Sequence, residues 1–251
     1  MLLAVNIGNS NIRFGVFDPE GNINSWTIAT KPIPGRDEFF KKYVDSLASQ
    51  NVEVNSISEI VIGSVVPNLN EMVAEILVEI HQIKPLFVDR NSKSKVRHTS
   101  NQMGTDLFAN AVAAHEFYEG KKIIVDFGTA LTFTGIDETG QTMGVSIAPG
   151  VITSLNSLVS ATAQLPQIEI KEPAKVLGFD TLSCMQSGMV YGFLSMVEGM
   201  IARINDELQE DCFVIATGGM SYTYAPLSTK IHKQDAFHTI KGLAILHELN
   251  K

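Results

Sequence analysis

Two short segments contain the residue types that bind phosphate groups. Each is an apolar run that ends in a turn of glycine and small polar residues: Asn6-Ile7-Gly8-Asn9-Ser10-Asn11 and Asp126-Phe127-Gly128-Thr129-Ala130. Backbone N–H groups that converge in such a turn form a nest for phosphate oxygens. A carboxylate at the end of the strand, as at Asp126, could position a cation that offsets phosphate charge. Taken singly, such a turn is more often an ordinary β-hairpin.

Two further positions could do chemistry, although each has a simpler structural explanation. The turn Thr217-Gly218-Gly219 lacks bulky side chains, so a flat base or a ribose could approach its backbone. In isolation, however, the two glycines indicate a tight turn after a strand. Asp106 follows Gly104-Thr105 at the expected start of a helix. It is either a first-turn acid that complements the helix dipole or a general base, and its residue type alone favours the first account.

The two candidate phosphate turns belong to a repeated pattern. In residues 5–17 and again in 125–137, an apolar run reaches a glycine turn and returns through apolar residues to a second glycine at the same offset. Short apolar runs bounded by small polar residues predict strands joined by a hairpin. Because the pattern occurs twice at long range, the sequence predicts two copies of one domain.

The elements around these hairpins predict an α/β fold. Apolar residues at 40, 43, 44 and 47 predict an amphipathic helix, and residues 105–118 predict a helix that connects the halves. The remaining expected elements are strands at 60–66, 85–88 and 212–216 and helices at 73–80, 191–208 and 235–249. This order predicts mixed sheets with flanking helices. We expect an N-terminal domain over 1–118 and a C-terminal domain over 119–251, with a cleft between them.

Composition excludes several classes of protein. With 27 acidic and 19 basic residues, the net charge of −8 argues against a non-specific nucleic-acid binder. No apolar stretch approaches about 20 residues and the N-terminus lacks a basic signal region, so we expect no membrane span and no signal peptide. Cys184 and Cys212 have no metal-ligand spacing and fit reduced thiols in a cytoplasmic protein. The P-loop pattern is absent as well.

In their order and spacing, the motifs resemble those of the type III pantothenate kinases, a family of the acetate and sugar kinase/Hsc70/actin superfamily. Asn6–Asn11 resembles the first phosphate motif of the family, and Asp126–Ala130 resembles the second. Gly104-Thr105-Asp106 is similar to the Gly-x-Asp-Arg element. The other matching segments are Gly144–Gly150, Gln164–Pro166, Thr181, Gln186–Gly188 and Thr217–Gly219. The resemblance implies two duplicated actin-like, ribonuclease H-like domains.

The resemblance also implies a reaction and a set of site residues. ATP with Mg²⁺ would phosphorylate the terminal hydroxyl of pantothenate to give 4′-phosphopantothenate, the first step towards coenzyme A. Asp106 would be the general base, Asp126 would bind a monovalent cation (K⁺ or NH₄⁺), and the protein would be a homodimer. ATP would bind Asn6, Ile7, Gly8, Asn9, Ser10, Asn11, Ile12, Arg13, Thr129, Gly218 and Gly219. Pantothenate would bind Arg97, Gly104, Thr105, Asp106, Leu107 and Thr181.

The sequence departs from the family pattern at two charged positions. Asn6 stands where the first motif has an aspartate, and Leu107 stands where the Gly-x-Asp-Arg element has its arginine. The segment Arg97–Asn101 also lacks the usual tyrosine and Asn-Pro pair. An amide keeps an oxygen ligand but loses the charge, whereas leucine removes a cation and its donors.

Three hypotheses about function remain. The chain is a working pantothenate kinase in which Arg97 or His98 replaces the missing cation, or it is a degenerate kinase with a regulatory or nucleotide-binding role. Alternatively, it is a kinase for another small hydroxylated metabolite.

Overall fold

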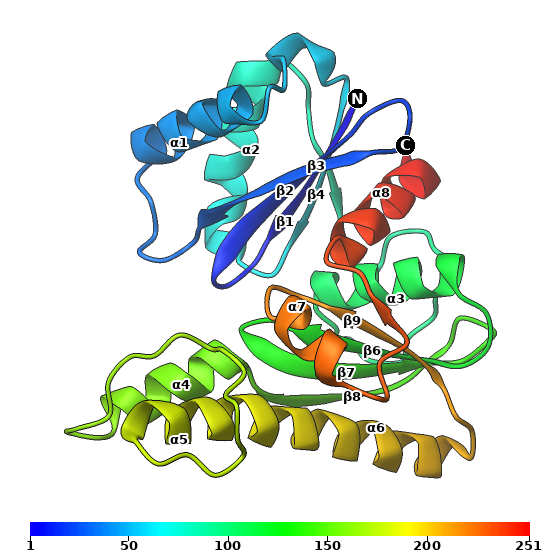
Figure 1. Ribbon diagram of the computed structural model, residues 1–251. Coiled ribbons are helices and arrows are strands. Elements are labelled where there is room, and N and C mark those ends of the chain that lie inside the picture. The colour runs from blue at the N-terminus through cyan, green and yellow to red at the C-terminus, as the bar shows by residue number, and fades with distance from the viewer. The chain divides into compact units, whose positions relative to one another are not determined.

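The computed structural model describes residues 1–251, and their contacts divide the chain into two compact units. Unit 1 consists of Met1–Glu116 and Phe237–Lys251, and unit 2 consists of Phe117–Ala236. Each unit contains one five-stranded mixed sheet with helices packed against it (Figure 1). The predicted α/β class is therefore confirmed.

The sheet of unit 1 contains the first predicted hairpin. Its strands are β1 (Leu2–Ile7), β2 (Asn11–Phe17), β3 (Ile23–Ala29), β4 (Glu59–Ser64) and β5 (Leu86–Val88). They lie in the order β3-β2-β1-β4-β5, with β1 to β3 antiparallel and β4 and β5 parallel to β1. Asn6 is paired with Arg13 on β2 and with Gly63 on β4. The hairpin that we expected over residues 5–17 is thus the antiparallel pair at the centre of this sheet.

The sheet of unit 2 repeats this topology. Its strands are β6 (Lys122–Phe127), β7 (Ala130–Ile136), β8 (Thr142–Pro149), β9 (Phe213–Thr217) and β10 (Lys233–Gln234). β6 to β8 form an antiparallel meander, and β9 and β10 extend the sheet in parallel on the other side of β6. The equivalent strands occur in the same order in both sheets, which confirms the duplication that the repeated hairpin predicted.

In unit 1 the helices α1 (Arg36–Ser49) and α2 (Pro67–His81) pack on one face of the sheet (Figure 1). The apolar face of α1 differs slightly from the expected one. Phe39, Tyr43 and Leu47 are buried, whereas Phe40 is only partly buried and Val44 is 36% exposed. The rings of Phe39 and Tyr43 stack with an interplanar angle of 7°, and both contact the ring of Phe14 on β2. The i, i+4, i+8 row therefore faces the core.

The C-terminal helix α8 (His238–Asn250) is the main departure from the expected domain division. We expected residues 119–251 to form the second half, but α8 packs on β1, β4 and β5 and belongs to unit 1. Two glycines make room for it, because a Cβ on Gly15 would collide with Ile240 and a Cβ on Gly63 with Leu243. The other helix of this unit, α3 (Thr105–Phe117), lies where the connecting helix was expected.

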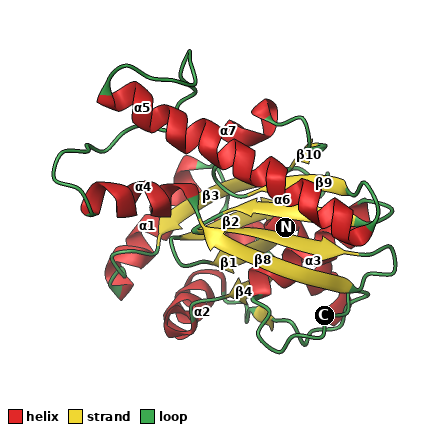
Figure 2. Cartoon of the chain, turned by 90° about the horizontal axis from the view of Figure 1, so that it is seen from below, coloured by secondary structure: helices red, strands yellow, loops and turns green.

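The helices of unit 2 are α4 (Val151–Ser160), α5 (Thr181–Ser187), α6 (Phe193–Leu208) and α7 (Ser221–Tyr224). The helix expected from residue 191 begins at Phe193 as α6, after one π-helical turn over Gly188–Gly192. Figure 2 shows α6 running along the sheet of this unit. Its residues Val197 and Ile201 are buried in the same core as Phe127 and Phe133. None of the helices in the chain combines the length and apolar character that crossing a bilayer requires.

Candidate functional site

The first candidate phosphate turn connects β1 to β2. The Gly8 N–H donates to the Asn11 carbonyl at 3.1 Å, which closes the turn. Thr30, just beyond β3, holds the turn from the side: its hydroxyl donates to the Gly8 carbonyl at 2.8 Å and its N–H to the Ser10 carbonyl at 2.9 Å. These bonds fix the backbone of a turn whose residues Asn9, Ser10 and Asn11 are exposed. The turn is thus a fixed, solvent-facing loop of the kind that binds anions.

Asn6 precedes this turn and has an unusual side chain. Its Oδ1 atom is buried and has no hydrogen-bond partner. Folded proteins rarely leave a buried polar atom unsatisfied, and doing so costs on the order of 1–3 kcal/mol. An amide oxygen is also one of the oxygen donors that Mg²⁺ accepts. Asn6 therefore fits a position where a cation, or a water molecule bound to one, is held.

Asp106 lies in the first turn of α3, near the same end of the sheet. A Cβ on Gly104 would lie only 2.6 Å from Asp106 Oδ1 and 3.4 Å from Val65 Cγ1. The N–H of Val65 donates in turn to the carbonyl of Ile7, at the end of β1. The structure therefore brings Gly104, Thr105 and Asp106 to the edge of the sheet where the first turn begins.

The environment of Asp106 favours its protonated form. Burial raises the pKa of its carboxyl group, and the hydrogen bond that Oδ1 accepts from the Leu107 N–H at 2.8 Å opposes this only in part. A carboxylate with a raised pKa is a stronger base than an exposed aspartate, which is the property that a general base needs. The bond to the Leu107 N–H also fits the simpler account, a first-turn acid that complements the helix dipole, whereas the burial of the carboxyl group favours the general base.

The segment before α3 contains Arg97 and His98, which differ in exposure and in contacts. Arg97 is exposed, whereas His98 stacks edge-on against Phe108 of α3 with ring centroids 5.5 Å apart. The His98 ring nitrogens lie 2.8 Å from the carbonyls of Ser100 and Arg90. Carbonyl oxygens only accept hydrogen bonds, so a ring nitrogen that makes either contact does so as an N–H donor. His98 is thus the better-ordered candidate for the cation that Leu107 does not supply.

The second candidate phosphate turn connects β6 to β7 in unit 2. The Gly128 N–H donates to the Ala130 carbonyl at 3.1 Å. The Thr129 carbonyl accepts from the Gly150 N–H at 3.1 Å and from the Thr153 hydroxyl at 2.7 Å, so the start of α4 holds the turn. Thr129 itself is exposed. As in unit 1, hydrogen bonds from a neighbouring element fix the backbone of a solvent-facing turn.

Asp126 lies beside two threonines, Thr132 and Thr217, whose side chains the sequence did not connect with it. In the register of the sheet, Asp126 is paired with Thr132 on β7 and with Thr217 on β9, so the three side chains share one face. The hydroxyls of Thr132 and Thr217 are both buried without a hydrogen-bond partner. The group therefore offers a carboxylate and two hydroxyl oxygens, the ligand type of hard cations. Only the strand register reveals it.

The remaining predicted residues of unit 2 lie in two places. Gly218 has φ +87°, and a Cβ there would lie 2.5 Å from Asp126 Oδ1, so this position next to the acid requires glycine. Gly219 follows it and is exposed. Thr181 is exposed at the start of α5, where Asp180 caps the helix by accepting from the Ser183 N–H at 2.7 Å. The structure thus groups Gly218 with Asp126 and places Thr181 on a separate helix.

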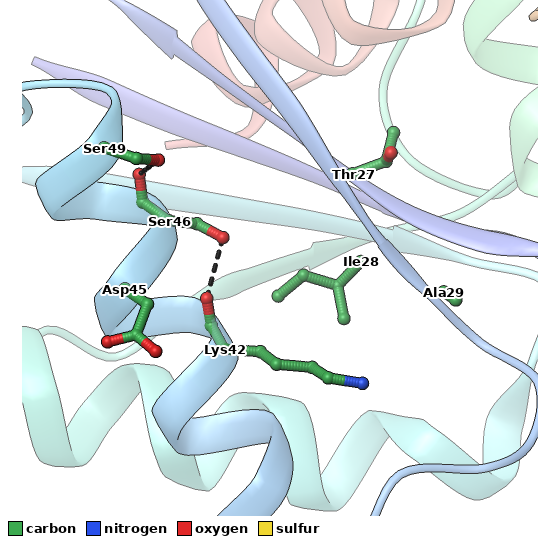
Figure 3. A pocket seen from close by; sticks show the side chains of 7 residues that line it. All are labelled: Thr27, Ile28, Ala29, Lys42, Asp45, Ser46 and Ser49. Carbon is green, nitrogen blue, oxygen red and sulfur yellow. Dashed lines mark hydrogen bonds between the residues drawn. The ribbon is translucent and has the colours of Figure 1, made fainter.

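Two open pockets of the molecule contain none of these residues. The first, of about 480 Å³, lies between β3 and α1 and is lined by Thr27, Ile28, Ala29, Lys42, Asp45, Ser46 and Ser49 (Figure 3). Its hydroxyl groups are largely used within the helix, since Ser46 donates to the Lys42 carbonyl and Ser49 to the Ser46 carbonyl. The second is lined by Met1, by residues around the β2–β3 turn such as Asp18 and Asn22, and by residues 51–53 and 56. Neither pocket gathers the chemistry that the two turns offer.

The family profile and similar curated proteins identify the same family. The sequence profile of the type III pantothenate kinases matches residues 2–203. The chain is 38% identical over 257 residues to the type III pantothenate kinase of Finegoldia magna, covering all of this chain and 98% of that protein. It is 34% identical over 254 residues to that of Geotalea daltonii, covering all of this chain and 99% of that protein.

Solved structures with low sequence identity share the fold. A putative 2-dehydro-3-deoxygalactonokinase from Sinorhizobium meliloti aligns with a TM-score of 0.58 and 14% identity, over 99% of this chain and 96% of that one. A ROK family glucokinase from Streptomyces griseus, solved with glucose and AMPPNP, aligns with a TM-score of 0.52 and 15% identity over 98% of both chains. Sugar kinases therefore share the duplicated architecture seen here.

Proposed function

Because the chain belongs to the family of type III pantothenate kinases, we propose that it transfers the γ-phosphoryl group of ATP to the terminal hydroxyl of pantothenate. The product is 4′-phosphopantothenate, and this is the first step of coenzyme A synthesis. The observation that carries this proposal is the placement of Asp106, a partly buried carboxylate with a raised pKa at the edge of the sheet where the β1–β2 turn begins.

Asp106 acts as the general base of the transfer. Its carboxylate accepts the proton of the substrate hydroxyl while the hydroxyl oxygen forms a bond to the γ-phosphorus. The bond between that phosphorus and the bridging oxygen breaks, and ADP leaves with the bonding electrons. Burial helps because a carboxylate that is poorly solvated accepts a proton more readily than an exposed one.

Substrate binding involves the residues around Asp106. Gly104, Thr105, Leu107 and Arg97 contact pantothenate, and Thr181 of unit 2 does so as well. Leu107 contributes no charge, and His98, which packs against Phe108 of α3, would supply a cation in its place when its ring is protonated. The apolar side chain of Leu107 also keeps water away from the base.

Both turns bind ATP. The backbone of Asn6–Arg13 binds phosphate oxygens, and Thr129, Gly218 and Gly219 bind ATP from unit 2. Bound Mg²⁺ would neutralise charge on the phosphates during transfer. The buried, unpartnered Oδ1 of Asn6 supports a place for this ion or one of its water ligands at the end of β1. Asn6 thereby serves with an amide oxygen where the family pattern has a carboxylate.

Asp126 binds a monovalent cation, K⁺ or NH₄⁺. Support comes from the two threonine hydroxyls, Thr132 and Thr217, that lie beside it without hydrogen-bond partners. Hydroxyl and carboxylate oxygens together suit a large, weakly hydrated cation that needs several oxygen ligands.

The working protein is a homodimer in the cytoplasm. Unit 2 exposes apolar side chains of a kind that a partner normally covers: Val145 and Ile147 on the edge strand β8, and Leu177 and Phe179 before α5. Ile147 is 70% exposed and Phe179 is 90% exposed. Such apolar surface is typical of an interface. The free cysteines Cys184 and Cys212 support a reducing compartment.

A coupled assay of ADP release tests the proposal. Purified protein with Mg²⁺, K⁺ and saturating ATP should release ADP only when pantothenate is present. Asp106→Asn should reduce kcat by about 10²–10⁴-fold because it removes the base. Asp45→Asn, which changes an exposed acid on α1, is the matched control and should leave the rate unchanged. A normal rate in Asp106→Asn would remove Asp106 from the mechanism, and tight ATP binding without turnover would favour a regulatory protein.

A further inference from the structure

Three side chains of unit 1 converge at the end of the sheet opposite the β1–β2 turn. Glu59 is the first residue of β4, and His247 and Glu248 lie in the last turn of α8. Their donor atoms all lie within 4.8 Å of one another. His247 Nδ1 is 3.8 Å from Glu59 Oε2 and 3.7 Å from Glu248 Oε1. The cluster therefore combines one imidazole nitrogen with two carboxylate oxygens.

His247 is the unusual member of this cluster. The residue is only 5% exposed, and its Nδ1 atom is buried without a hydrogen-bond partner. Separations of 3.7 and 3.8 Å are too long for hydrogen bonds to either carboxylate. Buried polar atoms in folded proteins are nearly always satisfied, so the nitrogen faces the two acids across a space where a partner is missing.

We propose that Glu59, His247 and Glu248 bind a divalent transition-metal ion such as zinc. Imidazole and carboxylate are zinc ligands, and three protein ligands with one water molecule complete a tetrahedron. Zinc–ligand bonds of roughly 2.0–2.2 Å separate neighbouring ligand atoms by about 3.4 Å. The two separations between His247 and the carboxylates would have to shorten by only a few tenths of an ångström, and the two carboxylate oxygens, which lie within 4.8 Å of each other, would close on the ion by rotation of their side chains. Glu59 and Glu248 are 43% and 57% exposed in their side chains, so they are free to make this adjustment.

A cation already occupies the outer side of the cluster. Lys251 Nζ lies 2.7 Å from Glu248 Oε2 and 3.9 Å from Glu59 Oε1. The Lys251 ammonium group lowers the pKa of Glu248 by its hydrogen bond. The C-terminal end of α8 also favours positive charge through the helix dipole. Lys251 is half exposed and does not reach the buried His247 nitrogen with any described contact, so a metal ion would compete with it for the two acids.

The position of the cluster separates it from phosphoryl transfer. β4 runs from Glu59 to Ser64, and five residue steps of about 3.3 Å place the two ends about 16 Å apart. The β1–β2 turn lies at the Ser64 end, because Ile7 pairs with Ser64. An ion at the Glu59 end would instead tie the last turn of α8 to the sheet. Metal binding would therefore stabilise the docking of α8 and leave the proposed kinase site untouched.

Calorimetric titration of chelator-treated protein with zinc chloride, without nucleotide, tests the site. We expect one equivalent of zinc to bind, and the Tm to rise by about 5–10 °C at zinc concentrations a hundredfold above the Kd. His247→Ala should abolish this binding. Glu248→Gln, at a half-exposed position that should not disturb folding, should weaken it at least about tenfold. The absorption spectrum of the cobalt-substituted protein should show the same losses.

Lys251→Ala provides the sharpest variant, because it removes the competing ammonium. Zinc should bind several-fold more tightly to Lys251→Ala than to the unmodified protein. Lys42→Ala, which breaks an exposed lysine–glutamate pair on α1, is the matched control and should bind zinc with unchanged affinity. Zinc affinity weaker than about 100 µM overturns the proposal. So does unchanged affinity in Glu248→Gln, or weaker binding in Lys251→Ala.

Discussion

Among the single residues, a few oxygen atoms of the proposed site have unusual surroundings. Asp106 has a carboxyl group with a raised pKa, and Asn6, Thr132 and Thr217 each have a buried oxygen without a hydrogen-bond partner. Such atoms reduce the stability of a protein that has no ligand. Their position beside the two glycine turns is compatible with stability given up for binding and catalysis.

Because the pKa of Asp106 is raised, Asp106→Asn should affect stability and activity in opposite directions. Since the folded-state pKa lies above the usual value of 3.8, the charged form at neutral pH reduces stability, and this cost disappears as pH falls through the folded-state pKa. Asp106→Asn should therefore keep or raise the Tm measured at pH 7 while it reduces kcat by about 10²–10⁴-fold. The kcat/KM of the unmodified protein should fall on acidification through the same pKa. A clearly lower Tm in Asp106→Asn would contradict this description of the carboxylate.

Removal of the Thr217 hydroxyl should weaken the binding of the monovalent cation. Thr217→Val keeps the shape of the side chain but removes the hydroxyl oxygen, and a single such interaction is worth on the order of 1–3 kcal/mol. The K⁺ concentration that gives half-maximal activation should rise at least about fivefold. Thr134→Val is the control. Thr134 is a buried threonine of β7 on the same face of the strand as Thr132, two residues further along, and its substitution should leave the K⁺ requirement unchanged. An unchanged K⁺ requirement in Thr217→Val would exclude the hydroxyl as a ligand.

At the scale of elements, the position of α8 depends on close backbone contact with α3. A Cβ on Gly242 would overlap the backbone of Ala109. Gly242→Ala should therefore destabilise the protein by about 1–3 kcal/mol. Gly199→Ala is the matched control, because Gly199 lies within α6 with no atom near its Cβ position, and alanine there should stabilise by roughly 0.5–1 kcal/mol. Urea denaturation of both variants measures the two changes, and equal destabilisation would contradict the packing argument.

The contact between α1 and α2 predicts a loss of stability in acid. The Tyr43 hydroxyl lies 2.8 Å from His81 Nε2, and His81 Nδ1 lies 3.2 Å from the Val54 carbonyl. The carbonyl can only accept, so Nδ1 donates to it and Nε2 accepts from the tyrosine. Burial lowers the pKa of His81, so its stabilising contribution is complete above about pH 6.5 and is lost as pH falls towards the folded-state pKa. The Tm of His81→Leu should vary less with pH over this interval.

At the scale of the whole molecule, the parts that the sequence predicted are those with a local signal. Both glycine hairpins, the helix at α3 and the α/β class were evident because alternating apolar residues and turn residues act over short ranges. The strands β3 and β8 were not expected, since β8 is an exposed edge strand whose side chains lack a buried face. The place of α8 depends on Gly15, Gly63 and Gly242, and no local pattern shows what a glycine will contact.

The candidate site was predictable to a similar extent. Asp106, Asp126 and the glycine turns stand in recognisable motifs, but the threonines beside Asp126 become neighbours only through the pairing of β6 with β7 and β9. The role of His98 was open in the sequence, and its contacts with two carbonyls and with Phe108 now distinguish it from the exposed Arg97.

We expect this chain to phosphorylate pantothenate although Asn6 and Leu107 replace charged residues of the family pattern. Mass spectrometry of a reaction with pantothenate, ATP, Mg²⁺ and K⁺ tests it most directly. We expect 4′-phosphopantothenate in an amount equal to the ADP formed, and at least about a hundredfold less of it per unit time in the Asp106→Asn reaction. ADP release without phosphopantothenate, or product only after Asn6→Asp is combined with Leu107→Arg, would contradict it.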